Sequence, residues 1–208
     1  MNLKKVLLYG DSNTWGHNPV DFTQLPRTWG NVAQELLPEC EIMIDGECGR
    51  ATLWGEGPKH GIACFRERYF VKKHDFDLIV IMLGTNDLLK QLQYKPERTA
   101  QALRQYIHET RVVYGDKTPK FLIISPIHVN DNVLKHPVFS ELYSPKSVDD
   151  SKRFAEAISK MASEEGVYFM NAADYAKASD IDGVHMVTEE HEKLGIAAAA
   201  KIKEILGL

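Results

Sequence analysis

The stretch that decides the fold is Leu78-Ile79-Val80-Ile81-Met82-Leu83, which is apolar at every position and runs straight into Gly84-Thr85-Asn86-Asp87. A strand with no polar position is buried on both faces, which is typical of a central strand in a parallel sheet. Shorter apolar runs of strand length lie on either side of it in the sequence. They occupy residues 5–9, 41–44, 121–124 and 167–170.

Longer amphipathic segments separate these runs, and we expect helices at residues 28–37, 96–114, 147–165 and 188–206. The second begins with proline and is followed by Gly115, which is the usual asymmetry of a helix. We expect Thr188 to be the N-cap of the last helix. Strand–helix alternation predicts an α/β protein: three layers, α/β/α, around a five-stranded, doubly wound parallel sheet of flavodoxin-like type. The irregular segment 125–146 is predicted to form a lid or pocket wall.

Composition excludes several classes of protein. The 208 residues predict one domain, 1–208, and 25 basic against 29 acidic side chains give a net charge of −4. Because a nucleic-acid partner requires a basic face, none is expected. The scattered Cys40, Cys48 and Cys64 contain no CxxC pair, so neither a disulfide framework nor a zinc site is predicted. No apolar run approaches the ~20 residues of a membrane span, so we expect a cytoplasmic protein without a membrane partner.

Polar clusters follow the predicted strands. They are Gly10-Asp11-Ser12-Asn13-Thr14, Gly46-Glu47-Cys48-Gly49-Arg50, Gly84-Thr85-Asn86-Asp87 and, after a short connection, Asp182-Gly183-Val184-His185. Parallel strands end at a common edge of the sheet, where doubly wound folds bind their ligands. The topology therefore predicts that these four clusters share one crevice.

The residue types in that crevice fit acyl chemistry. A serine such as Ser12 is a poor nucleophile until a base takes its proton. His185 is a suitable base, and Asp182, three residues earlier, is spaced to orient its ring. Gly49 and Ser12 offer backbone N–H groups, and Asn86 offers a side-chain amide, for a developing oxyanion.

These four clusters resemble the sequence blocks of the SGNH hydrolases, also called GDSL-type esterases, and most closely the bacterial arylesterase and acyltransferase branch. The resemblance covers essentially the whole chain, with the blocks in family order. It implies Ser12, Asp182 and His185 as catalytic residues, and Ser12, Gly49 and Asn86 as the oxyanion hole. This chain departs from the family at Asn13, where leucine is frequent, and at Cys48 and Ala51.

Other residues near the clusters have a structural and a functional interpretation. For Asp11 and Asp87 we favour turn-shaping hydrogen bonds to backbone N–H groups, and for Arg50 a structural ion pair is at least as well supported as substrate binding. Packing is the default for aromatic and cysteine side chains. Five residues are nevertheless candidates for the substrate pocket: Asn13, Trp15, Cys48, Trp54 and His128.

The leading prediction is a serine esterase that acts on small esters with short acyl groups, acetylated sugars included, without a cofactor or metal. Acyl transfer to an alcohol, or deacetylation of carbohydrate, remains open on the same residues. A second class is a metal-dependent phosphoesterase using Asp11, Asn86, Asp87 and His185. A flavodoxin-like binding module is a third, although no GxGxxG or P-loop pattern occurs. A homo-oligomer is also expected as a possibility, with Phe139, Leu142 and Tyr143 supplying contacts.

Overall fold

A computed structural model describes residues 3–208. Its centre is a parallel sheet of β1 (Lys4–Gly10), β2 (Cys40–Gly46), β3 (Leu78–Met82), β4 (Lys120–Ser125) and β5 (Tyr168–Asn171). The strand order is β2-β1-β3-β4-β5. All five residues of β3 are buried, as the unbroken apolar sequence predicts. The expected flavodoxin-like α/β fold is confirmed.

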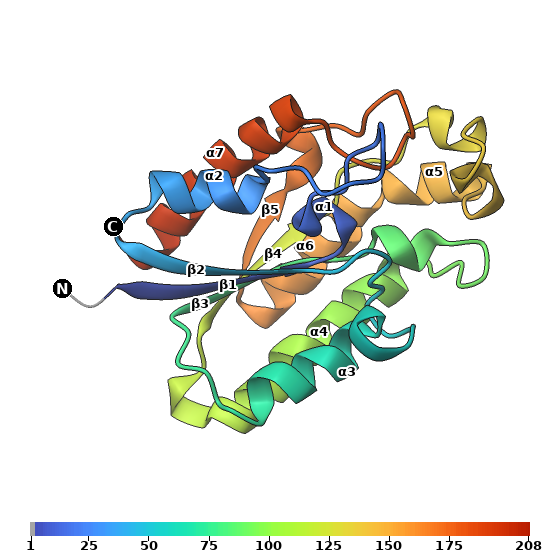
Figure 1. Ribbon diagram of the computed structural model, residues 1–208. Coiled ribbons are helices and arrows are strands. Elements are labelled where there is room, and N and C mark those ends of the chain that lie inside the picture. The colour runs from blue at the N-terminus through green and yellow to red at the C-terminus, as the bar shows by residue number, and fades with distance from the viewer. Residues whose placement is uncertain (1–2) are drawn as a thin grey trace.

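Helices cover both faces of the sheet (Figure 1). On one face, α2 (Trp29–Leu36) and α7 (Thr188–Leu206) lie side by side and bury residues such as Trp29 and Leu194 against β1 and β3. The other face carries α3 (Gly61–Phe65), α4 (Pro96–Tyr114) and α6 (Phe154–Glu165). The short α1 (Ser12–Trp15) directly follows β1.

Two expectations about helices are wrong. The helix expected at 147–165 is divided into α5 (Pro145–Ser151) and α6. At the break, the Ser151 hydroxyl donates to the Val148 carbonyl and accepts from the Val129 N–H, so it competes with helical bonding. Thr188 begins α7 rather than capping it: Val187 is the N-cap, without a side-chain bond, and Glu189 and Glu190 complement the helix dipole instead.

The strand order places the candidate site. From β1 the chain steps outward to β2 and later returns to the other side of β1 as β3, so the order reverses between β1 and β3. Crevices at such points are the usual ligand sites of doubly wound sheets. Ser12 follows β1 and Asn86 follows β3, one on each side of this reversal. Among residues 3–208, no helix is both long and apolar enough to cross a membrane.

Candidate active site

Three side chains form a continuous hydrogen-bonded chain at the carboxyl edge of the sheet. The Oγ of Ser12 lies 2.9 Å from His185 Nε2, and His185 Nδ1 lies 2.6 Å from Asp182 Oδ2. All three residues are buried, with Ser12 5% and His185 4% exposed. This order of hydroxyl, imidazole and carboxylate lets the ring accept the serine proton while the carboxylate fixes its other nitrogen.

Asp182 fixes the conformation of the loop that contains His185. Asp182 Oδ1 accepts from the backbone N–H groups of Val184 and His185, both at 2.9 Å. Burial alone would raise the pKa of Asp182, but hydrogen bonds from His185 and these N–H groups outweigh it and hold that pKa below its usual value. Gly183 has φ +75°, and a Cβ there would meet the Val133 nitrogen at 2.3 Å, so the turn requires glycine.

Asn13 ties this loop to the end of β1. Its Nδ2 donates to the Val184 carbonyl at 3.2 Å, and its Oδ1 accepts from the Met186 N–H at 3.1 Å. Asn13 therefore binds the residues on both sides of His185 and is only 2% exposed. The sequence makes Asn13 a candidate for the substrate pocket, but its side chain is buried between two backbone segments.

The candidate oxyanion donors follow β1, β2 and β3 at the same edge of the sheet. Gly49 adopts φ +80° in the turn after β2, a conformation that favours glycine. Asn86 Nδ2 donates one hydrogen to the Arg50 carbonyl at 3.1 Å, which joins the β3 loop to the turn containing Gly49. Its second amide hydrogen has no partner in the part of the chain described, and neither do the N–H groups of Ser12 and Gly49.

Three buried charged residues make structural contacts in these loops. Arg50, fully buried, donates to the Gly10 and Asp45 carbonyls and pairs with the Asp45 carboxylate at 2.9 Å. Asp87 accepts from the Thr52 N–H and hydroxyl and from the Thr99 hydroxyl. Asp11 likewise accepts from the Asn13 N–H. The contacts of Asp11 and Asp87 with backbone N–H groups, and the ion pair of Arg50, are the structural roles considered for these residues from the sequence.

Aromatic rings cover the imidazole of His185: Phe139 comes from segment 125–146, the expected lid or pocket wall, whereas sequence reasoning missed His17. The His17 ring lies 4.1 Å from that of His185, and the Phe139 ring lies 5.4 Å from it. Burial, followed by the proximity of His185, lowers the pKa of His17 to about 4. These contacts join residues more than 40 positions apart, so no local sequence pattern indicates that the rings meet. Trp15 lies beyond His17, with ring centroids 6.4 Å apart.

The remaining candidate pocket residues have different surroundings. Cys48 is half-buried beside His17, and burial, then Asp11 and Glu47, raise the pKa of its thiol to about 11, so it stays protonated. Trp54 is 42% exposed. His128 is also exposed, and no hydrogen bond or ring contact connects it to the Ser12–His185–Asp182 chain within residues 3–208. Tyr143, expected at a subunit contact, is buried in its own chain.

The ligand set of the phosphoesterase alternative is not assembled. Asp87 is fully buried, and both of its oxygens are occupied by Thr52 and Thr99. His17, Asp182 and His185 do offer potential ligand atoms within 4.8 Å of one another. This group shares only His185 with the predicted ligand set, and Asp182 Oδ2 and His185 Nδ1 are hydrogen-bonded to each other.

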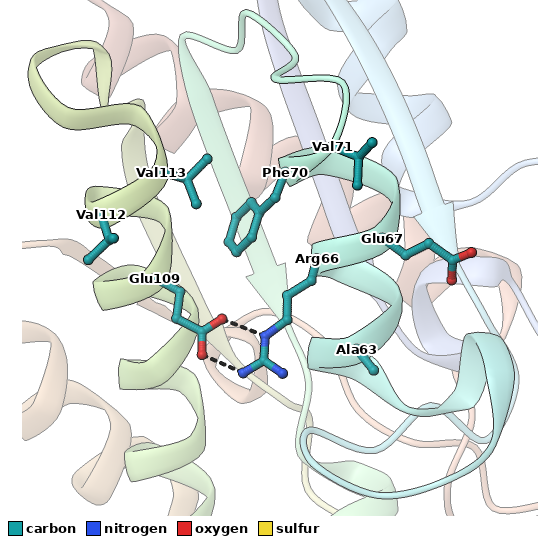
Figure 2. Close-up of a pocket in the computed structure, with 8 residues that line it drawn as sticks. All are labelled: Ala63, Arg66, Glu67, Phe70, Val71, Glu109, Val112 and Val113. Atoms are coloured by element: carbon teal, nitrogen blue, oxygen red, sulfur yellow. Dashed lines mark hydrogen bonds and ion pairs between the residues drawn. The ribbon is translucent and has the colours of Figure 1, made fainter.

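A large hollow of about 650 Å³ lies away from this crevice. It is formed between α3, the π-helical turn Arg66–Phe70 that continues it, and α4 (Figure 2). Phe70 and Val113 face each other across it, and the Arg66–Glu109 ion pair bridges it. It contains no residue that the sequence singled out for the chemistry.

Comparisons with known proteins identify the family of this chain. The model of the GDSL-like Lipase/Acylhydrolase family matches residues 8–191. A search of curated proteins found no match. Among solved structures, one assigned as an arylesterase of Agrobacterium tumefaciens is 28% identical, with TM-score 0.86, covering 98% of this chain and 100% of that one. The inhibitor-bound M. smegmatis aryl esterase is 25% identical, with TM-score 0.87, covering 97% and 99%.

A carbohydrate acetylesterase family member from Sinorhizobium meliloti has the same fold. Its TM-score is 0.89 at 24% identity, over 99% of this chain and 100% of that one. The family model spans most of the chain and includes the four polar clusters of the crevice up to His191. The chain therefore belongs to the GDSL-like lipase/acylhydrolase family and is a hydrolase with the SGNH fold.

Proposed function

We propose that this hydrolase cleaves short-chain carboxylic esters through an acyl-enzyme on Ser12. The observation that carries the proposal is the continuous chain from Ser12 Oγ to His185 Nε2 and from His185 Nδ1 to Asp182 Oδ2. His185 takes the Ser12 proton as the oxygen attacks the ester carbonyl, and Asp182 stabilises the resulting imidazolium. The protonated ring then donates to the departing alcohol oxygen.

The tetrahedral intermediate places negative charge on the former carbonyl oxygen. We assign its stabilisation to the N–H groups of Ser12 and Gly49 and the second amide hydrogen of Asn86. Fixed donors of this kind are usually the largest contribution to acyl-transfer catalysis. A water molecule then attacks the acyl-enzyme, giving its proton to His185, and the acid departs as Ser12 recovers its proton.

Small acyl groups suit a site roofed by aromatic rings. His17 and Phe139 both lie against the ring of His185, the residue that is hydrogen-bonded to Ser12. The names of the similar structures, aryl esterase and carbohydrate acetylesterase, support acetyl esters of phenols or sugars as the first compounds to test. Acyl transfer to an alcohol uses the same acyl-enzyme and differs only in the final acceptor.

The test compares wild-type protein with Ser12→Ala on 4-nitrophenyl esters from acetate to octanoate. We expect turnover to be highest for the shortest acyl groups and to fall to background in the variant. Undiminished turnover in Ser12→Ala would refute the proposal. Repeating the assay with added alcohol and separating the products distinguishes hydrolysis from transfer.

A further inference from the structure

A lysine side chain lies against the glycine that we assign to the oxyanion hole. Lys59 ends a short turn, Gly57–Lys59, and its carbonyl accepts from the Ala51 N–H at 3.1 Å. The Pro58 carbonyl accepts from Arg50 Nε at 2.9 Å. These bonds fix the turn to the loop that contains Gly49, so the position of Lys59 is set by the same loop.

The aliphatic part of Lys59 packs along Gly49, on the side where a Cβ would lie. A Cβ built on Gly49 would lie 3.6 Å from Lys59 Cδ, 3.7 Å from Cε and 3.9 Å from Nζ. These are ordinary van der Waals distances, so the stem lies along the glycine and the ammonium ends beside it. Long charged side chains commonly pack their methylenes in this way and leave the charged end in water.

The ammonium of Lys59 is not neutralised locally. Across residues 3–208, no carboxylate lies within 4.0 Å of it, and it donates no hydrogen bond to a protein atom. Its charge nevertheless acts on Cys48, the residue before Gly49. Burial, Asp11 and Glu47 all raise the pKa of the Cys48 thiol, and Lys59 is the group that opposes them. An unpaired cation at the edge of a crevice attracts an anionic group of a ligand.

We propose that Lys59 forms an anion subsite, so that the preferred esters carry a carboxylate or similar anionic group on their acyl or alcohol portion. The inference rests on the proposed function, because it names a substrate class for the same Ser12 site. Since Lys59 is exposed and its ion pair would be partly screened, the expected effect is about two- to fivefold in kcat/KM.

The experiment uses two matched pairs of esters. 4-Acetoxybenzoate and its methyl ester differ in charge on the alcohol portion, whereas phenyl hydrogen adipate and phenyl hexanoate differ in charge on the acyl portion. Wild type, Lys59→Met and Lys59→Arg are assayed at low and high salt. Lys117→Met is the control, since Lys117 is an exposed lysine in the turn that follows α4.

We expect wild type to favour the anionic member of one pair, and that pair identifies the portion of the ester that carries the charge. Lys59→Met should lose this preference two- to fivefold through KM, Lys59→Arg should keep it, and high salt should weaken it. Equal effects of Lys59→Met on charged and neutral esters, or no preference in wild type, would overturn the inference. Turnover of neutral esters that still requires Ser12 would leave the proposed function intact.

Discussion

At the scale of single residues, Asn86 has two amide hydrogens, and only one of them has a partner among residues 3–208. The Arg50 carbonyl orients the group, which leaves the other hydrogen for the oxyanion. Asn86→Ala should therefore lower kcat by about 10²–10³, the usual cost of one oxyanion donor. Steady-state kinetics with an acetyl ester would show this with an unchanged far-UV spectrum. A kcat within twofold of wild type would remove Asn86 from the mechanism.

Asp11, next to Ser12, predicts a pH-dependent stability. Burial raises its pKa to about 6, although the Asn13 N–H and His185 lower it. In the unfolded chain the same carboxyl has its ordinary pKa of 3.8. Between these values the folded state holds a proton that the unfolded state has lost, so stability falls as pH rises from about 4 to about 6. Two pKa units correspond to at most about 3 kcal/mol.

Asp11→Asn tests this sign, because asparagine stays neutral. The free energy of unfolding is measured by urea titration for both proteins at pH 4.5 and at pH 8. Relative to wild type, the variant should be more stable at pH 8 than it is at pH 4.5. This shift in relative stability should be up to about 3 kcal/mol. If the relative stability were the same at both pH values, Asp11 would titrate alike in the folded and unfolded states.

At the scale of elements, Asn13 connects the β1–α1 junction with the His185 loop. Asn13→Leu keeps the size of the side chain but leaves the buried Val184 carbonyl and Met186 N–H without partners. Each buried unpaired group costs about 1–3 kcal/mol. We expect a lower melting temperature together with a reduced kcat, because the ring of His185 loses its fixed position.

Asn171→Leu is the matched control for Asn13→Leu. Asn171 also bonds through its side chain, to the Ser125 hydroxyl and the Ala173 N–H, but at the end of β5. Its loss should lower the melting temperature while kcat is retained. A parallel fall of kcat in both variants would mean that lost stability, rather than the position of His185, reduces activity.

Strands and most helices could be predicted because their signals are local. The expected run 78–83 became β3 and the expected helix 96–114 became α4, since burial on both faces and the flanking Pro and Gly are visible in the sequence. The division between α5 and α6 was not visible. It depends on a hydrogen bond from the Val129 N–H to the Ser151 hydroxyl. The two residues are 22 positions apart, so the hydrophobic periodicity of the helix does not indicate this contact.

At the scale of the whole molecule, Arg50 holds together segments from three parts of the fold. It is buried over the Tyr9 ring at 4.1 Å and bonds to carbonyls of Gly10, Asp45 and Pro58. Arg50→Met should destabilise the protein by about 3 kcal/mol. This is the lower end of the usual cost of breaking a buried ion pair, because the Asp45 carboxylate keeps Arg68 as a partner. Guanidinium unfolding measures this loss.

Arg68→Met is the control, because Arg68 binds the same carboxylate but its side chain is 44% exposed. Its loss should cost about 1 kcal/mol or less. Equal destabilisation in the two variants would show that burial of the Arg50 guanidinium contributes nothing beyond a surface ion pair.

The gathering of the four polar clusters could be predicted from topology, since parallel strands share a carboxyl edge. The roof over the site could be predicted only in part, because segment 125–146, which contains Phe139, was expected as a lid or pocket wall whereas His17 was not expected there. His17 and Phe139 reach His185 from the loop after α1 and from the segment after β4, and their meeting depends on how these loops pack. Sequence blocks therefore indicate the reaction, whereas packing between loops sets the space around it.

The central claim is that Ser12 becomes covalently acylated, and a serine-directed phosphonate tests it most directly. The protein is treated with an alkyl fluorophosphonate and digested, and the modified peptide is located by mass spectrometry, with Ser12→Ala in parallel. We predict one adduct, on Ser12, forming in step with loss of esterase activity and absent from the variant. Inactivation without an adduct on Ser12, or an adduct that persists in Ser12→Ala, would contradict the account.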